Sequence, residues 1–544
     1  MIRFLDSRPL LISTLGPVHV GCGVDYEPTG YVMEERIVHT FDPVEALRDN
    51  APAREKLSHL CAGSGEEVIQ KVQEFFYEKR DELIPFSTHS LTASEQLQKF
   101  YDERVKPERR MGKANKLYIE RTAYVATENR PILPGSSLKG AIRTALLNRE
   151  HDGKKLVDPG AAERKDDWKK IVPLNQTLKN CLPGDFARDP MRLIRVGDAG
   201  ATERWTGNDL RFAVNRTRSG KAAKGPYQVL ECLPPMELEL FSGTLSFLDP
   251  GSASNVAENR DDLPANIWNS KDVTRSCNQF YEKRLRQELD ELQAFMPQQF
   301  RKIMIQSLEG GGLRRLLDSG RAFLLRVGRH CGAESVTLEG VRHIKQPQWK
   351  KWVERPDTVW LAAKGQETMD DLLPFGWLLV EWNDSRRKPL TETALELVGM
   401  SEGGSKTRKK LRAAAEEKKK KLREKNEVER LQREKVRQER ERLALAEEEK
   451  KKRLQSLSEN ERLIEQLRQR LEKTRVPQPI GGDLWQEVQA LVKKIEGARQ
   501  EWQAHEIAAL ALLCREELPT RLKGGQKKLK ELEERLNRLQ GEKP

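Results

Sequence analysis

Short apolar runs rich in β-branched residues alternate with helical stretches over the first 400 residues of the chain. We take five of these runs as strands, namely Pro9 to Leu15, Leu117 to Val125, Leu238 to Phe247, Ala322 to Val327 and Trp377 to Trp382. Runs of this length and composition are typical of buried strands, whereas the stretches between them have helical periodicity. The pattern therefore predicts an α+β fold.

The pattern changes near Gly403. The segment from Ser405 to Leu454 has almost no apolar content and contains neither Gly nor Pro, which predicts a long solvated helix. A thin apolar seam with a spacing of seven, interrupted at Lys450, consists of Val436, Leu443, Leu457, Ile464 and Leu471. Such spacing is typical of a coiled coil, but this seam is too poor to specify self-dimerisation.

The segment from Val476 to Asp483 breaks this helix with two prolines and two glycines. Apolar residues then recur at intervals of three and four, as Leu484, Val488, Leu491, Ile495 and Trp502, and again as Leu529, Leu532, Leu536 and Leu539. They predict two amphipathic helices that pack on each other or fold back on the first. We expect a charged helix over 404–475 and an amphipathic helical region over 476–544; a solvated spacer without a specific partner is the alternative.

Charge narrows the choice of partners. The 544 residues include 97 Lys and Arg against 84 Asp and Glu, a formal net charge of +13 that favours polyanions, with nucleic acid ahead of anionic membrane. No run of about 18 apolar residues is present, and polar residues interrupt the N-terminal segment, so we expect a cytoplasmic protein. The seven cysteines contain no C-x-x-C pair, which predicts reduced thiols and argues against a disulfide framework or a zinc ribbon.

The stretch from Arg130 to Leu147 predicts a turn followed by a helix. Pro134 and Gly135 turn the chain, Ser136 or Ser137 is suited to cap the helix, and the helix is expected to begin at Leu138. Its buried stripe should contain Leu138, Ile142, Ala145 and Leu146.

Lys139 and Arg143 are four residues apart and share another face of this helix. Free backbone N–H groups, two serine hydroxyls and two cations together predict an anion site suited to phosphate. The alternative is a capped surface helix with solvated basic side chains. A second basic segment, Asn215 to Pro226, contains Arg216, Arg218, Lys221 and Lys224, and is either a solvated insertion or an arm that orders on a phosphate backbone.

Residues 132–147, "ILPGSSLKGAIRTALL", resemble the signature of the RAMP superfamily of CRISPR-associated proteins. Further segments that resemble this family, in its order, are 12–43, 194–200, 227–247, 323–340 and 373–382. Their combination resembles the Csm subunit that caps the crRNA 3′ end in type III-A effector complexes. The resemblance covers about residues 8 to 383; the tail from Gly403 departs from the family pattern.

The resemblance implies two ferredoxin-like, RRM-related lobes, an N-terminal lobe with a helical insertion over 1–200 and a C-terminal lobe over 201–403, followed by a coiled-coil-like extension. It implies that Lys139 and Arg143 supply charge to the RNA backbone and that Ser136 and Ser137 supply hydrogen-bond donors. Glycines of two loops would allow close approach of RNA, with basic neighbours in contact; these residues are Gly21, Gly23, Gly328, Gly332, Arg326, Arg329 and His330. For each glycine the alternative is a tight turn.

Catalytic candidates are few. His19 could act as a general base but has no identified partner, and Asp25 does not closely match the acidic residue of the cleaving backbone subunits. His19 with Cys22, or His330 with Cys331, lacks the second pair that a zinc site needs, and no P-loop or G-x-S-x-G motif is present. We expect no enzymatic activity and no cofactor.

These observations favour a crRNA-binding structural subunit that caps a type III-A Csm interference complex at the crRNA 3′ end and assists crRNA maturation in antiviral defence. The partners that the resemblance implies are crRNA, the repeating backbone RAMP subunit of the Csm complex, target RNA and a host exonuclease, with no membrane. Two alternatives are a RAMP-family endoribonuclease that uses His19 and a coiled-coil assembly scaffold in which residues 404–544 provide the function.

Overall fold

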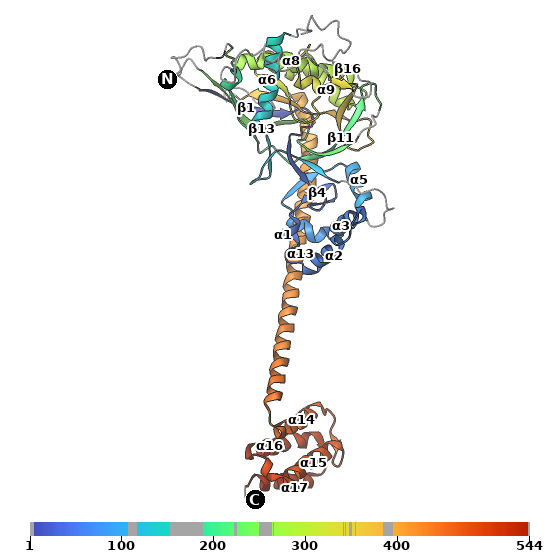
Figure 1. Cartoon of the computed structure of the whole chain (residues 1–544), viewed down its shortest axis with the longest axis vertical. Coiled ribbons are helices and arrows are strands. Elements are labelled where there is room, and N and C mark those ends of the chain that lie inside the picture. Colours follow the sequence, from blue (N-terminus) through green and yellow to red (C-terminus); the bar gives the residue numbers. More distant parts are fainter. Residues whose placement is uncertain are drawn as a thin grey trace. The chain divides into compact units, whose positions relative to one another are not determined.

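The computed structural model divides the chain into two compact units, Met1–Asn426 (unit 1) and Glu427–Pro544 (unit 2). It describes residues 5–106, 117–152, 189–221, 226–249, 264, 266–340, 342, 344–346, 351–353, 355–383 and 395–541. Lys224 of the predicted basic arm and Cys181 lie outside the described residues. Figure 1 labels the elements.

Unit 1 contains an antiparallel eight-stranded sheet with the order β14-β19-β1-β13-β10-β8-β7, in which β9 also pairs with β13. Its strands are β1 (Leu5–Thr14), β7 (Tyr124–Val125), β8 (Arg130–Leu133), β9 (Ile194–Val196), β10 (Ala199–Ala201), β13 (Glu237–Leu248), β14 (Ala322–Arg326) and β19 (Trp377–Trp382). The central pair joins distant parts of the chain, with Leu5 of β1 opposite Leu248 of β13. Sequence-distant segments therefore build this sheet together.

A second, mixed sheet of nine strands has the order β2-β6-β12-β11-β5-β4-β3, with β17 on β11 and β18 on β17. Its strands are β2 (Gly21–Tyr26), β3 (Tyr31–Glu34), β4 (Ile37–Thr40), β5 (His89–Thr92), β6 (Ile119–Thr122), β11 (Asp209–Thr217), β12 (Gln228–Cys232), β17 (Thr358–Ala363) and β18 (Leu373–Pro374). A separate ribbon pairs β15 (Ile344–Gln346) with β16 (Lys351–Val353). Four of the five predicted strand runs lie in one strand each to within a residue, whereas Leu117 to Val125 is divided between β6 and β7 of different sheets. The mixed fold class is confirmed.

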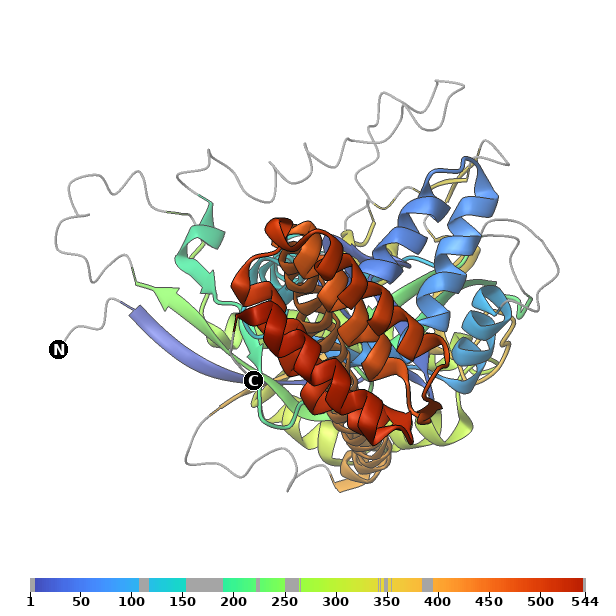
Figure 2. The same cartoon turned by 90° about the horizontal axis from the view of Figure 1, so that it is seen from below.

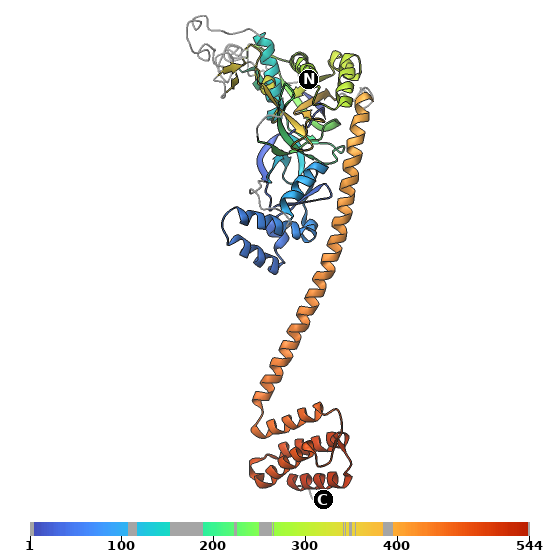
Figure 3. The same ribbon diagram turned by 90° about the vertical axis from the view of Figure 1, so that its right-hand side faces the viewer.

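Helices cover both sheets. They are α1 (Pro43–Leu47), α2 (Ala51–Cys61), α3 (Glu66–Glu78), α4 (Arg80–Leu83), α5 (Glu95–Val105), α6 (Gly135–His151), α8 (Ser270–Glu291), α9 (Gln298–Glu309), α10 (Gly312–Asp318) and α11 (Ala333–Val336). Helix α8 packs on α6 and on β14 of the eight-stranded sheet. The blue helices α1 to α4 gather beside the β3–β4 hairpin (Figure 3) around a small core that includes Phe41, Phe75 and Phe76.

Helix α13 (Leu395–Ser456) begins within unit 1. Arg408 is buried there between the carboxylates of Asp209 and Glu237. Further along the same helix, the Lys418 Nζ lies 2.5 Å from Glu34 Oε2. Residues 404–426 therefore pack on unit 1, and the division of the chain falls after Asn426 rather than at the predicted change of composition.

Unit 2 contains four helices that share one apolar core and lie side by side in the red part of Figure 2. They are α14 (Glu459–Lys473), α15 (Asp483–Gly497), α16 (Ala504–Arg521) and α17 (Gln526–Gln540), and a short parallel pair joins β20 (Gln478–Pro479) to β21 (Leu522–Lys523). The predicted break at 476–483 and the two amphipathic helices that follow it are confirmed, but α16 was not predicted as a separate helix.

The predicted seam of apolar residues at a spacing of seven is not one continuous stripe. A capping box at Ser458 and Glu461 starts α14, so the long helix ends at Ser456. Val436 and Leu443 on α13 remain 56% and 58% exposed, whereas Ile464 and Leu471 on α14 are buried among α15, α16 and α17. The prediction of a single helix over 404–475 was therefore wrong at Leu457.

Candidate nucleic-acid interface

Helix α6 begins three residues earlier than the sequence suggested. Its N-cap is Pro134, neither serine caps it, and Gly135 is its first residue. A Cβ on Gly135 would lie 2.2 Å from the carbonyl oxygen of Val196, so only glycine fits at this start. The prediction that Ser136 or Ser137 caps the helix was wrong because the helix already begins at Gly135, packed against the backbone of Val196 and Gly197.

The Asp198 carboxylate occupies part of the anion site predicted at this helix end. The backbone N–H of Gly135 donates to Asp198 Oδ1 at 2.7 Å. A carboxylate at a helix N-terminus satisfies free N–H groups and interacts favourably with the helix dipole. The protein therefore supplies its own anion at this position.

The remainder of the α6 motif follows the prediction. Its predicted buried stripe is confirmed, since Leu138, Ile142, Ala145 and Leu146 are all buried. Ser136 is exposed, and Ser137, Lys139 and Arg143 are half-buried. Burial lowers the pKa of Lys139, and nearby Arg195 lowers it further against the opposing effect of Asp189. Lys139 and Arg143 thus remain accessible on one face, and their contact with RNA stays a prediction.

The two predicted glycine segments meet. Gly328, at φ +84°, lies against the carbonyl oxygen of His19, and the N–H of Arg329 donates to that same oxygen at 2.8 Å. Gly21 and Gly23 lie on β2, whose first five residues are exposed, and Gly23 has φ +77° with open space around it. The fold therefore places an exposed glycine strand next to the C-terminal glycine loop.

Arg329 and His330 flank this junction. Arg329 is 43% exposed and pairs with Glu120 of β6. The His330 ring stacks on Trp360 at a centroid distance of 4.6 Å, and its Nε2 lies 2.8 Å from Gln228 Oε1. Burial, assisted by Arg329 and His19, lowers the pKa of His330 to about 4. Arg329 can therefore reach a ligand by exchanging a surface ion pair, whereas His330 is a neutral packing residue.

The three other arginines predicted to contact RNA, Arg216, Arg218 and Arg326, bond to groups within unit 1. Arg216 donates to the carbonyl oxygens of Gln366 and Thr368 at 3.1 and 2.6 Å. Arg218 pairs with Glu291 and Glu334 at 2.8 and 2.6 Å. The described part of the basic segment is thus the end of β11 and a tight turn, in which carbonyl oxygens accept from Arg216 and carboxylates pair with Arg218.

Arg326 is also internal. It is buried, pairs with Glu288, and donates through Nε to the Phe375 carbonyl oxygen at 2.8 Å. Its guanidinium carbon lies 5.0 Å from the centroid of the Trp377 ring. RNA contact by Arg216, Arg218 and Arg326 would require each to give up these bonds, and none of the three is an accessible candidate in this fold.

His19 is fully buried beneath the glycine strand. Its Nδ1 lies 2.8 Å from the Glu231 carbonyl oxygen, and its Nε2 has no hydrogen-bond partner in the described part of the chain. Burial lowers its pKa, which outweighs the opposing effects of Glu231 and Glu120. Asp25, by contrast, is exposed on β2. The imidazole of His19 is therefore neutral and closed off from solvent, and we interpret His19 as a structural residue.

An aromatic and cationic cluster formed by β2, β6 and β7 was not predicted from the sequence. The guanidinium of Arg121 on β6 lies 3.2 Å from the Tyr124 ring centroid and 5.0 Å from that of Tyr26. Gly21 pairs with Thr122 in the neighbouring register position. The alternation of basic and aromatic residues in "YIERTAY" was the available signal, since such pairs contact bases and phosphates alike.

The described residues contain neither a group suited to hold a metal ion nor a helix suited to span a membrane. In these ranges no group of three or more His, Cys, Asp or Glu side chains is arranged to hold a metal ion. Nor is any helix among them long and apolar enough to cross a bilayer.

A family model identifies the class of protein to which this chain belongs. The family model of the RAMP superfamily matches residues 11–308, which is more than half of the chain and includes the end of β1, helix α6 and strand β13. The chain therefore belongs to the RAMP superfamily.

One individual protein is similar to part of this chain. The chain is 25% identical over 232 residues to the protein named "CRISPR system Cms protein Csm5" of Methanocaldococcus jannaschii, a match that covers 39% of this chain and 49% of the relative. The similarity thus spans about half the length of that relative.

Two solved structures are similar as well. A chain of the cryo-EM structure of a Csm–crRNA–target RNA ternary complex from a type III-A CRISPR-Cas system is 17% identical with a TM-score of 0.44, over 69% of this chain and 100% of that chain. The crystal structure of T. onnurineus Csm5 is 18% identical with a TM-score of 0.38, over 68% and 99%. The family assignment rests on the family model and not on these two structures.

Proposed function

We propose that this RAMP protein is a Csm5-like, crRNA-binding subunit of a type III-A interference complex, which caps the complex at the crRNA 3′ end and assists crRNA maturation. The observation that carries the proposal is the convergence of the two RAMP glycine segments at His19 and Gly328, beside the exposed strand β2. The similarity to Csm5 supports the choice of subunit. RNA would approach the glycine backbone, with Arg329 and Arg121 at its phosphates and bases.

The proposed partners follow from this role. They are crRNA, the repeating backbone RAMP subunit, target RNA and a host exonuclease, in the cytoplasm. We assign unit 1 to two ferredoxin-like, RRM-related lobes and unit 2 to a coiled-coil-like extension. The α6–α8 layer on an antiparallel sheet supports the first assignment, and the charged helix followed by a helical bundle supports the second.

We assign no catalytic step to the chain. His19, the residue best suited by type to act as a base, is buried with a lowered pKa, and a general base must come within hydrogen-bond reach of the proton that it removes. Maturation of crRNA is accordingly assigned to a separate nuclease that this subunit positions.

The test is binding of labelled crRNA to the purified full-length protein across a salt series, measured by fluorescence anisotropy, with the same samples analysed for cleavage. The variant Lys139→Glu/Arg143→Glu should bind about tenfold more weakly and should lower the slope of log K against log salt by about 1.4, at about 0.7 per phosphate contact of a single strand. The matched control Lys409→Glu/Lys410→Glu, which reverses two exposed lysines of α13, should behave as wild type.

Failure of the wild-type protein to bind crRNA would overturn the proposal. If the control variant weakens crRNA binding as much as the α6 variant does, the loss of affinity reflects net charge and not a contact at α6. Cleavage products made by the wild-type protein alone would favour the endoribonuclease alternative, which a His19→Ala variant would then test.

A further inference from the structure

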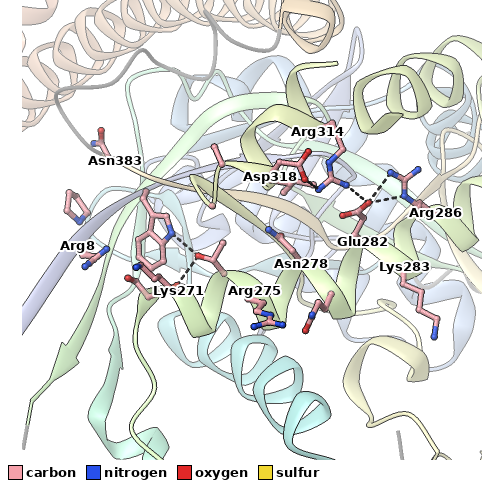
Figure 4. A pocket seen from close by; sticks show the side chains of 18 of the residues that line it. Arg8, Lys271, Arg275, Asn278, Glu282, Lys283, Arg286, Arg314, Asp318 and Asn383 are labelled. Carbon is pink, nitrogen blue, oxygen red and sulfur yellow. Dashed lines mark hydrogen bonds and ion pairs between the residues drawn. The ribbon is translucent and has the colours of Figure 1, made fainter. Parts of the chain in front are cut away.

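A long groove in unit 1 lies along one side of α8. Its walls are the exposed side of α8, residues Ser7–Pro9 of β1, the end of β19 at Trp382 and Asn383, and the C-terminal end of α10 (Figure 4), and its volume is about 1280 Å³. This exceeds the roughly 300–1,000 Å³ of small-molecule pockets. Its size suits a segment of a chain molecule better than a metabolite.

Charge in the groove is strongly one-sided. The cationic side chains that line it are Arg8, Lys271, Arg275, Lys283, Arg286 and Arg314, and the acidic ones are Glu282 and Asp318. Both acids are engaged with these cations: Glu282 accepts from Arg286 at 3.0 Å and from Arg314 at 2.7 Å, and Asp318 accepts from Arg314 at 2.5 Å. Figure 4 shows Glu282 between the two guanidinium groups. The acids therefore orient two arginines and leave an excess of positive charge.

In the part of the chain that the structure describes, the remaining cations are unpaired or held only by surface ion pairs; Arg8 pairs with Asp6 at 2.9 Å, where the two side chains are 44% and 47% exposed. Lys271 and Arg275, one helical turn apart, are exposed and have no ion-pair partner among the described residues. Lys283 pairs with Glu339 at 3.2 Å on the surface, where such a pair contributes only about 0–1 kcal/mol and exchanges readily. A row of cations thus runs from Lys271 to Arg286, a rise of about 22 Å at ~1.5 Å per residue.

The frame of the groove is fixed. Asn278 bridges to the edge strand β14, donating to the Ala322 carbonyl oxygen and accepting from the Leu324 N–H, both at 3.1 Å. The Trp382 Nε1 donates to Thr274 Oγ1 at 3.0 Å, and Arg8 lies 5.8 Å from the centroid of that ring. Because α8 is bonded to the sheet at both positions, the backbone that carries these cations keeps its position before a ligand arrives.

We infer that this groove binds the sugar-phosphate backbone of a single-stranded RNA segment, as a second RNA contact distinct from α6 and the glycine junction. The inference rests on the proposed function, which supplies RNA as the polyanion. Four of the six cations are arginines, whose planar forks match phosphate oxygens in a bidentate manner. A cationic row with few apolar residues favours a regular phosphate backbone over an acidic protein, which would need apolar anchors.

The groove is separate from the α6 site because α8 turns another side to α6. Tyr281 donates to the Ala141 carbonyl oxygen of α6 at 3.1 Å and is fully buried, and Asp272 pairs with Arg149 at 3.1 Å. The groove residues lie on the solvent side of the same helix. Helix α8 therefore joins the two RNA-binding surfaces without sharing side chains between them.

The experiment compares full-length wild type, Lys271→Gln/Arg275→Gln, Lys271→Glu/Arg275→Glu and the control Lys409→Glu/Lys410→Glu, binding labelled single-stranded RNAs of increasing length. Both groove variants should lower affinity, with about a tenfold loss for the charge reversal, and should lower the salt slope by about 1.4. The deficit should appear only with RNAs long enough to reach the groove. Ultraviolet cross-linking with peptide identification should place cross-links of the wild type in residues 270–286.

Different experimental results would overturn the inference about the groove and the proposed function. If the groove variants bind all lengths as wild type does and no cross-link maps to α8, the groove inference is wrong even where Lys139→Glu/Arg143→Glu weakens binding. If wild type binds no RNA of any length, the proposed function itself fails. Equal displacement of RNA from the groove by polyglutamate at matched charge would also overturn the inference, because it would show no preference for phosphate. The glutamine variant and melting curves for every protein separate loss of binding from loss of folding.

Discussion

Gly328 and His19, more than 300 residues apart in the sequence, are in direct backbone contact: a Cβ on Gly328 would lie 2.2 Å from the carbonyl oxygen of His19. Gly328 also has φ +84°, a conformation that side chains other than glycine rarely adopt. The contact holds the C-terminal glycine loop against the start of β2. The proposed RNA-binding junction therefore depends on the absence of a single side chain.

Gly328→Ala should destabilise unit 1 by about 1–3 kcal/mol or more, because it adds backbone strain and a clash with His19. The measurement is denaturant unfolding of the full-length protein. Gly140→Ala is the matched control: Gly140 lies within α6 with open space around it, so alanine should stabilise the protein by about 0.5–1 kcal/mol. Equal effects of the two substitutions would contradict the close contact at Gly328.

Asp198→Ala should cost about 1 kcal/mol, since it removes the acceptor that satisfies the Gly135 N–H at the start of α6. Asp198→Asn keeps an acceptor oxygen and removes only the charge, so it should retain most of the stability. If phosphate approaches this helix end, both variants should also bind crRNA more tightly in the anisotropy assay, because a competing anion is gone. Unchanged affinity in both would exclude the α6 N-terminus as a phosphate site.

Arg408→Met should destabilise unit 1 by about 3–5 kcal/mol, because it leaves the buried carboxylates of Asp209 and Glu237 without this cation. Thermal unfolding measures the loss. The double substitution Asp209→Asn/Glu237→Gln in the Arg408→Met background should recover part of the stability, whereas no recovery would show that the methionine fails to pack.

Acid unfolding offers a second measurement at the same site. Burial raises the pKa of Asp209, but the charges of Arg211 and Arg408 and the hydrogen bonds from Thr92 and Arg211 together lower it by more, so its folded pKa lies below the ordinary value. The stability that this ionised group contributes is present above the ordinary aspartate pKa of about 4 and is lost as pH falls through the lower folded pKa. Arg408→Met should therefore shift acid unfolding to higher pH; an unshifted midpoint would contradict the pairing.

His330 should remain neutral until the pH approaches 4, because burial against Trp360 and Phe375 lowers its pKa to about 4. Its folded pKa is below the unfolded value of about 6.5, so its contribution to stability is present above pH 6.5 and declines as pH falls toward 4. Two-dimensional NMR of the imidazole resonances gives the titration directly. A midpoint near 6.5 would mean that the ring is solvated.

Leu471→Ala should destabilise unit 2 by about 2–5 kcal/mol, because Leu471 is fully buried in the four-helix core. Leu443→Ala changes the same residue type at the same heptad spacing on α13, where the side chain is 58% exposed, and should change stability by no more than about 0.5 kcal/mol. Denaturant unfolding followed by helical circular dichroism compares the two. A large effect at Leu443 would mean that a partner covers this part of α13.

Only those features of the site that depend on neighbouring residues in the sequence could be predicted from it. The buried stripe and the accessible cations of α6 were readable because helical spacing alone decides which residues share a face. The helix start was not, because the backbone at Val196 and the carboxylate of Asp198, more than 60 residues away, determine it. Likewise, Arg216, Arg218 and Arg326 are basic in any context, but only their neighbours reveal that their donors are already used.

The sequence by itself determined the strand runs, the mixed fold class, the RAMP resemblance and the change to a charged helix near Gly403, because periodicity, composition and short motifs are local properties. The tertiary structure alone decided that the two glycine segments meet, that the apolar seam divides between an exposed helix and a buried core, and that a cationic groove forms along α8. Each of these depends on contacts between residues far apart in the chain, which β-sheet pairing and helix packing bring together and which no local pattern encodes.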